Sequence, residues 1–263
     1  MERIIDFHTH MFPDALAARA VAGLSESSDI PAYTNGTVQA TRAITARAGI
    51  TEFVGLNISV SLKQQKNVNN FAISENGNRL HMFGSVHPFA EDRFSELDRI
   101  AAAGLSGVKL HNEYQNFDVD DVRVFPMYEK IASLGLICLF HAGADKAYKT
   151  PLRCAPHMLK TVRQNFSALK IVAAHLGGYQ EYAETAVHTA KSGIWFDTSM
   201  FFLFPEGAAE KLIGLIGTER VLFGSDCPWD DPAHGVAFIK GLPLTAREKE
   251  HILYNNAANL LKK

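Results

Sequence analysis

The sequence is poor in cysteine and has no long apolar run. Its 263 residues include three cysteines, which are widely spaced and form no C-x-x-C motif: Cys138, Cys154 and Cys227. This usage argues against a disulfide framework and a thiolate zinc site, so we expect a reducing, cytoplasmic setting. No stretch reaches the roughly 18 apolar residues that span a bilayer. Strand residues are predicted from Arg3 onward, so we expect neither a membrane anchor nor a signal peptide.

The sequence also lacks an excess of positive charge. It has 26 lysines and arginines against 28 acidic residues, with no basic run. Because phosphate binding needs clustered lysines and arginines, we expect no nucleic acid partner. The glycine motifs G-x-G-x-x-G after the first strand and G-x-x-x-x-G-K-[ST] are also missing. Their absence removes the usual support for an open nucleotide-binding sheet.

What the sequence does contain is a regular alternation of short apolar runs with amphipathic segments. Eight runs are typical of buried strands: Ile4–Phe7, Glu52–Ile58, His81–His87, Gly107–His111, Leu136–His141, Ile171–His175, Ile194–Thr198 and Val221–Ser225. Helical patterns lie between and after them: Val38–Ala48, Val68–Asn76, Arg93–Ala103, Phe125–Leu134, His157–Asn165, Glu181–Lys191, Glu206–Ile216 and Ala246–Leu261. This order predicts an α/β protein, a (β/α)8 TIM barrel that forms a single domain over residues 1–263. Residues 11–37 are the longest irregular stretch, and we expect a lid or substrate-binding excursion there.

Polar side chains gather where these predicted strands end. His8 and His10 close the first strand two residues apart, and the period of a strand places both imidazoles on one face. Asp226 closes the eighth strand. Six of the eleven histidines occupy such positions: His8, His10, His87, His111, His141 and His175. Strand ends converge on one face of a barrel, and imidazole with carboxylate suits a divalent ion, so the pattern predicts a metal site.

Taken together, the strand-end motifs resemble the amidohydrolase superfamily, and within it the amidohydrolase 2 branch. That branch includes aminocarboxymuconate-semialdehyde decarboxylase and the resorcylate decarboxylases. The resemblance spans essentially the whole chain. It is carried by Asp-Phe-His-Thr-His at 6–10, Gly-Val-Lys-Leu-His at 107–111, Phe-His-Ala-Gly at 140–143, Ala-His-Leu-Gly-Gly at 174–178, Phe-Gly-Ser-Asp at 223–226 and Asn255 near the end.

The resemblance implies roles for individual residues. His8, His10, His141 and Asp226 are then the ligands of one divalent metal, zinc by preference, with manganese, iron and cobalt as alternatives. Asp226 also accepts a proton from the attacking water. His175 acts as an acid, a base or a polarising group near the metal.

The fourth strand allows more than one interpretation. In two-metal members of the superfamily a carboxylated lysine or a glutamate bridges the ions from about the position of Lys109. We favour substrate anchoring or an ion pair for Lys109, because an ammonium presents a strong point charge to an anion. His111 shares its face and either contacts substrate or supports the site. Asp6 and Asp197 are expected to hold hydrogen bonds beneath the metal.

We therefore predict a metal-dependent hydrolase whose activated water cleaves an amide, ester or lactone bond in a small molecule. The alternative is a non-oxidative, metal-dependent decarboxylase, although the near-minimal length of the barrel favours hydrolysis. A catalytically idle metal-binding protein and a metal-free lactonase are further alternatives. The expected partner is a small-molecule substrate, a carboxylate if Lys109 anchors it, and the sequence is compatible with a homo-oligomer.

Overall fold

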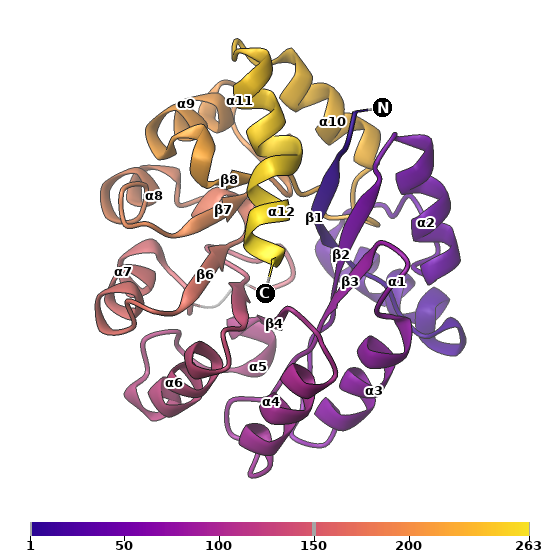
Figure 1. Cartoon of the computed structure of the whole chain (residues 1–263), viewed down its shortest axis with the longest axis vertical. Helices are drawn as coiled ribbons and strands as arrows, with labels where there is room; N and C mark the ends of the chain where they lie inside the picture. The colour runs from indigo at the N-terminus through magenta and orange to yellow at the C-terminus, as the bar shows by residue number, and fades with distance from the viewer. Residues whose placement is uncertain (1, 149–150, 263) are drawn as a thin grey trace.

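The computed structural model describes residues 2–148 and 151–262. In these ranges eight strands form two parallel sheets, ordered β1-β2-β3 and β4-β5-β6-β7-β8. The strands are β1 (Ile5–Thr9), β2 (Glu52–Leu56), β3 (Leu80–Phe83), β4 (Gly107–Leu110), β5 (Ile137–Phe140), β6 (Lys170–Ala173), β7 (Trp195–Asp197) and β8 (Val221–Leu222). Parallel bridges from Gly84 to Val108 and from Thr9 to Cys227 join the sheets at both margins. The strands thus form a ring, and the predicted (β/α)8 barrel is confirmed (Figure 1).

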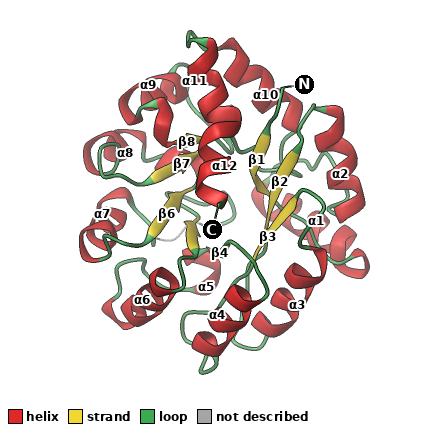
Figure 2. Ribbon diagram, viewed as in Figure 1, coloured by secondary structure: helices red, strands yellow, loops and turns green. Residues whose placement is uncertain are grey.

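Most of the helices form an outer layer around the strands (Figure 2). The helices of the described ranges are α1 (Asp14–Ser28), α2 (Val38–Arg47), α3 (Gln65–Glu75), α4 (Arg93–Ala102), α5 (Asn112–Gln115), α6 (Phe125–Ser133), α7 (Pro156–Asn165), α8 (Tyr182–His188), α9 (Ala208–Ile216), α10 (Pro232–Gly241), α11 (Ala246–Glu250) and α12 (Asn256–Leu261). Local signals explain their ends. The Thr37 side chain accepts a hydrogen bond from Ala40 N–H at the start of α2. Gly49 follows α2 with φ of 77°, a conformation that glycine adopts without steric cost.

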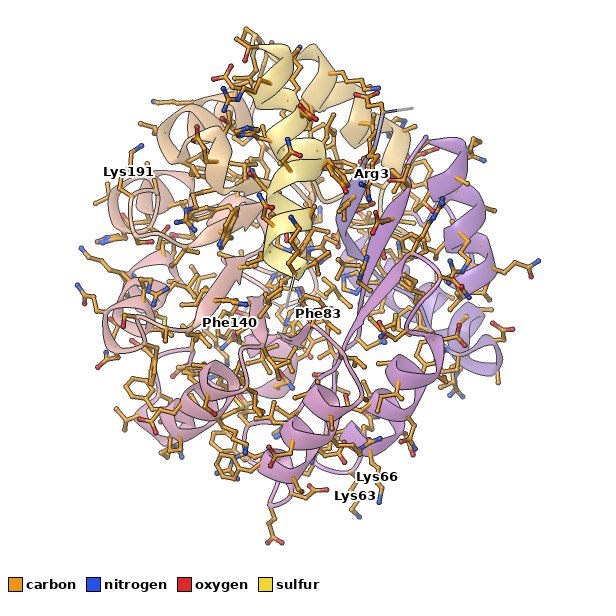
Figure 3. The ribbon with its side chains drawn as sticks, viewed as in Figure 1. Arg3, Lys63, Lys66, Phe83, Phe140 and Lys191 are labelled. Atoms are coloured by element: carbon orange, nitrogen blue, oxygen red, sulfur yellow. The ribbon has the colours of Figure 1, made fainter. Side chains whose placement is uncertain are left out.

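The core has two parts, because side chains of each strand alternate between the inside and the outside of the barrel. Ile5, Val54 and Leu222 belong to an interior cluster, which also contains Ala257 and Leu260 of α12. Helix α12 therefore closes one end of the barrel, and in Figure 1 it crosses the middle of the ring. A larger cluster fills the space between the strands and the outer helices. Figure 3 places Phe83 and Phe140 near the middle of the molecule and Lys63, Lys66 and Lys191 at its edge.

Three expectations about the helices were wrong or incomplete. The stretch 11–37 is not irregular, because α1 occupies much of it and is rich in alanine, the strongest helix former. Helix α10 was not predicted, although Asp231 caps its first turn and Pro232 stands at its first position. The predicted helix Ala246–Leu261 contains a π-helical turn at His251–Asn255 between α11 and α12. Within the described ranges, no helix combines the length and the apolar character needed to cross a membrane.

Candidate metal centre

Three of the predicted ligands form a compact triangle at the carboxyl ends of β1 and β8. His8 Nε2 lies 3.2 Å from His10 Nε2, and each nitrogen lies 3.2 Å from Asp226 Oδ1. Donor atoms about 2.0–2.1 Å from a tetrahedral ion are about 3.3 Å apart, so these spacings fit a shared divalent metal such as Zn²⁺. Both histidines are largely buried, as is the carboxylate.

Neighbouring groups hold the two histidine rings in place. His8 Nδ1 lies 2.8 Å from the buried carboxylate of Asp197, and His10 Nδ1 lies 3.0 Å from the main-chain oxygen of Leu56. Each ring therefore donates from Nδ1 and keeps the lone pair of Nε2 for the triangle. The register of β1 against β2 shifts between Asp6 and Thr9, and irregularities of this kind re-aim side chains beside active sites.

Asp6 anchors the strand that carries these histidines, as its position predicts. Its carboxylate accepts hydrogen bonds from the main-chain N–H of His8 at 3.1 Å and of Ser225 at 3.0 Å. The Ser225 hydroxyl donates a further bond at 2.5 Å. Burial raises the pKa of Asp6 to about 7 despite these bonds. Asp6 thus ties β1 to the segment that leads into Asp226.

The electrostatics of the triangle favour neutral imidazoles and an ionised carboxylate. Burial lowers the pKa of His8 well below its usual value, and the positive charge of Lys109 adds to the effect. Burial by itself would raise the pKa of Asp226, but His8, His10 and Lys109 lower it on balance. These are the protonation states in which the side chains can bind a metal.

His175 lies beside the triangle in a chain of polar groups. Its ring centroid is 5.3 Å from that of His8, and its Nε2 lies 3.0 Å from His141 Nδ1. Its Nδ1 lies 2.8 Å from the hydroxyl of Ser199. Burial lowers the pKa of His175 well below its usual value, so its ring is neutral near pH 7. Its backbone has φ of 57°, and Asp226 has φ of 68°, strained conformations that cluster at functional sites.

His141 does not share the triangle with the other three predicted ligands. It forms a second group with His111 and Asp145, whose carboxylate lies 3.3 Å from His111 Nε2 and 3.8 Å from His141 Nε2. The rings of His111 and His141 are stacked, with centroids 4.1 Å apart and an angle of 13° between them. The in-plane lone pairs of two stacked rings do not meet at one point, so one of the two rings would have to turn before this group could share an ion.

Lys109 lies deep in the same cavity, with 1% of its surface exposed. Burial lowers its pKa to about 8, against the attraction of Asp197 and Asp226. Its ammonium makes no hydrogen bond or ion pair with any other described residue. A buried cation of this kind is suited to a negatively charged oxygen of a bound molecule.

A cavity of about 460 Å³ opens above the triangle. Besides the residues described above, Tyr114 and Trp229 line it, and the Tyr114 ring stacks on His111 with centroids 3.8 Å apart. His87 is not among the described lining residues. Gln115 donates hydrogen bonds to Ser59 O and Val86 O and therefore joins two loops beside the cavity.

Sequence reasoning missed Asp145 and the helical form of α1, although it did expect a substrate-binding segment within residues 11–37. Asp145 lies in the loop after β5, where no periodic pattern marks a single aspartate as functional. Residues from Phe12 to Ile30 supply one wall of the cavity. The spacing of apolar residues within 11–37 is the pattern from which the helix in this wall could have been predicted.

The fold and the site together define a TIM-barrel protein with a candidate metal centre at the carboxyl ends of its strands. The chain belongs to the amidohydrolase family, whose model matches residues 5–263. No curated protein matches the chain.

Solved structures share the fold over nearly the whole chain. An uncharacterized TIM-barrel protein from Bordetella bronchiseptica is 22% identical with a TM-score of 0.76, and the match covers 98% of each chain. A probable 2-pyrone-4,6-dicarboxylic acid hydrolase from Acinetobacter baumannii, with citric acid bound, is 19% identical with a TM-score of 0.71 over 99% of each chain. A dihydroxybenzoic acid decarboxylase from Polaromonas sp. JS666, with bound manganese, is 15% identical with a TM-score of 0.72 over 99% of this chain and 97% of that chain.

Proposed function

We propose that the protein is a metal-dependent hydrolase that cleaves an amide, ester or lactone bond in a small molecule. The observation that carries the proposal is the triangle of His8, His10 and Asp226, with 3.2 Å between donor atoms. Membership of the amidohydrolase family supports the same reading. His8, His10 and Asp226 would hold a divalent ion here, which would supply Lewis-acid chemistry by lowering the pKa of a water to about 7 and polarising a carbonyl oxygen.

Zinc is the metal we propose, because two imidazoles and one carboxylate form a donor set that zinc commonly takes in catalytic sites. The same donors also suit manganese, iron and cobalt. The decarboxylase of similar fold with bound manganese makes manganese the first alternative to test. We propose His141 as the fourth ligand, with its ring turning out of the stack with His111 when the metal binds.

The residues around the triangle have distinct proposed roles. Asp226, held ionised by its neighbours, accepts a proton from the attacking water and returns it to the leaving group. His175 is neutral, and its Nε2–H would leave His141 Nδ1, which lies 3.0 Å away, to donate a hydrogen bond to the oxyanion that develops on the substrate. Lys109 binds an anionic group of the substrate, and His111 contacts the substrate beside Tyr114.

Non-oxidative decarboxylation is the second candidate. Two observations favour it: several solved structures of this fold are decarboxylases of aromatic acids, and Lys109 is a buried cation without a partner in the described chain. In this reaction Lys109 would hold the carboxylate, and His175 or Asp226 would deliver a proton to carbon as carbon dioxide leaves.

A paired assay separates the two functions. Protein reconstituted with zinc or manganese is offered a panel of esters, lactones and amides, and separately a panel of aromatic and muconate-like acids with carbon dioxide detection. Hydrolysis that is lost in Asp226→Asn supports the first function, whereas metal-dependent carbon dioxide release supports the second. Turnover that persists after the metal is removed from a folded protein would contradict both.

A further inference from the structure

The cavity above the triangle is chemically divided, and one side of it is apolar. We use the term apolar lobe for the side lined by residues of α1, α3 and the segments next to them: Leu16, Leu24, Ile30, Ile58, Val68 and Phe71. Leu24 and Val68 are only half-buried, so their side chains leave apolar surface facing the cavity. Ser28, Gln64 and Asn67 also line the cavity and carry no charge. The cavity above the polar triangle therefore extends into a region that is lined mainly by apolar side chains.

The apolar character extends to the rim of the cavity. Leu16, Val60 and Leu62 are large side chains that are 47%, 43% and 53% exposed, and Leu16 and Val60 line the cavity as well. They follow β1 and β2, so they lie at the same end of the barrel as the metal donors. Grouped exposed apolar side chains beside a pocket are a common mark of ligand binding.

The described lining of the cavity contains few positively charged side chains. Among the described lining residues the cations are two lysines, Lys109 and Lys146, with no arginine. A substrate with several carboxylates would find few partners here, because each buried carboxylate needs a paired cation or several hydrogen-bond donors. A molecule with one polar end and an apolar body matches both parts of the cavity.

We propose that the substrate carries an extended apolar group, an alkyl chain or a ring system, which lies in the apolar lobe between α1 and α3 while its carbonyl group faces the triangle. The proposal rests on the proposed function and adds the class of substrate to it. Burial of each methylene contributes about 0.8 kcal/mol, which is about fourfold in affinity. Affinity for a homologous series should therefore rise with chain length until the lobe is filled.

Linear alkyl hydroxamates with four to eight carbons test the proposal, measured as dissociation constants for the zinc-loaded and the chelator-treated protein. Between four and eight carbons the dissociation constant is expected to fall roughly 250-fold in both forms. Zinc is expected to lower every dissociation constant by a common factor. If zinc leaves all the dissociation constants unchanged, the metal centre is contradicted. The dependence of affinity on chain length would still show whether the apolar lobe binds the alkyl group. A dissociation constant independent of chain length in both forms would overturn the lobe alone.

A variant that fills the lobe provides the structural control. Leu24→Trp adds volume where the side chain is half-buried against the cavity, and it is expected to remove most of the gain from four to eight carbons. Leu215→Trp makes a similar change on an exposed leucine of α9, away from the cavity, and should leave the gain intact. If Leu24→Trp keeps the full gain and instead alters the sedimentation coefficient, the lobe is a contact between copies of the chain and our assignment fails.

Discussion

Replacing Asp197 with asparagine is expected to weaken metal binding by changing the tautomer of His8. One carboxylate oxygen of Asp197 accepts from the main-chain N–H groups of His175 and Ser199, both at 3.1 Å, and the other faces His8 Nδ1 at 2.8 Å. An asparagine must present its NH₂ group to one side. Facing the main-chain donors would leave two N–H groups unpaired, which costs about 1–3 kcal/mol each. The NH₂ group should therefore face His8, where a change of tautomer removes the conflict.

The change of tautomer moves the proton to Nε2, the atom that points into the triangle. That proton must leave before a metal can bind. Loss of an outer partner of a ligating histidine typically weakens metal binding 10- to 100-fold, or about 1.4–2.7 kcal/mol. We expect a loss in this range for Asp197→Asn.

Competition with a colorimetric chelator measures the zinc dissociation constant directly. Asp98→Asn makes the same chemical change at an exposed surface ion pair with Lys130 and should leave the constant unchanged. If Asp197→Asn binds zinc as tightly as the wild type and only its stability is reduced, the reasoning is refuted. That result would mean that Asp197 holds the main chain of the seventh strand end and does not set the state of His8.

Three further predictions concern other parts of the site. Gly224→Ala should weaken zinc binding about tenfold, because a Cβ at this position would lie 2.9 Å from the Cβ of His8 and displace its ring, measured by the same competition. Ser225→Ala should lower the free energy of unfolding by about 1–3 kcal/mol in urea, because it leaves the buried Asp6 carboxyl without its hydroxyl partner. Burial raises the folded-state pKa of Glu113 to about 7, so the folded chain holds a proton that the unfolded chain, with its usual pKa near 4.5, loses. The wild type should therefore lose about 3 kcal/mol relative to Glu113→Gln as the pH rises from 4.5 through 7, measured by urea unfolding across this range.

Matched controls make these predictions specific. Gly241→Ala introduces a Cβ that meets no atom within 4 Å and should not affect zinc binding. Ser133→Ala removes an exposed hydroxyl and should not affect unfolding. Equal zinc affinity in Gly224→Ala and Gly241→Ala, or equal stability in the two serine variants, would contradict the corresponding argument. If the difference in free energy of unfolding between wild type and Glu113→Gln did not vary with pH, it would contradict the raised pKa of Glu113.

The barrel could be predicted because short apolar runs alternate with amphipathic segments along the whole chain. Nearly continuous apolar runs mark strands that are covered on both faces, and the intervening amphipathic segments mark the outer helices. Helix α1 was missed because its second half, Gly23 to Ser28, is rich in glycine and serine, which hides the apolar stripe of its first half. The composition of the second half therefore concealed the helical periodicity of the segment.

The candidate site was only partly predictable for a different reason. Motif spacing places His8, His10 and Asp226 at strand ends, and the fold brings strand ends together. Spacing does not determine side-chain torsions, so it could not show that the ring of His141 stacks on His111. Nor could it select Asp145, which meets His111 only through the course of the loop after β5.

Elemental analysis of the purified protein beside a His8→Ala/His10→Ala variant of verified fold is the most direct test of the central claim. The account predicts about one equivalent of zinc or another divalent metal in the wild type and its loss in the variant. Two equivalents would require a second ion near His111, His141 and Asp145, against the stacked geometry of their rings. No metal after reconstitution, or metal retained by the variant, would contradict the assignment of the triangle as a metal centre.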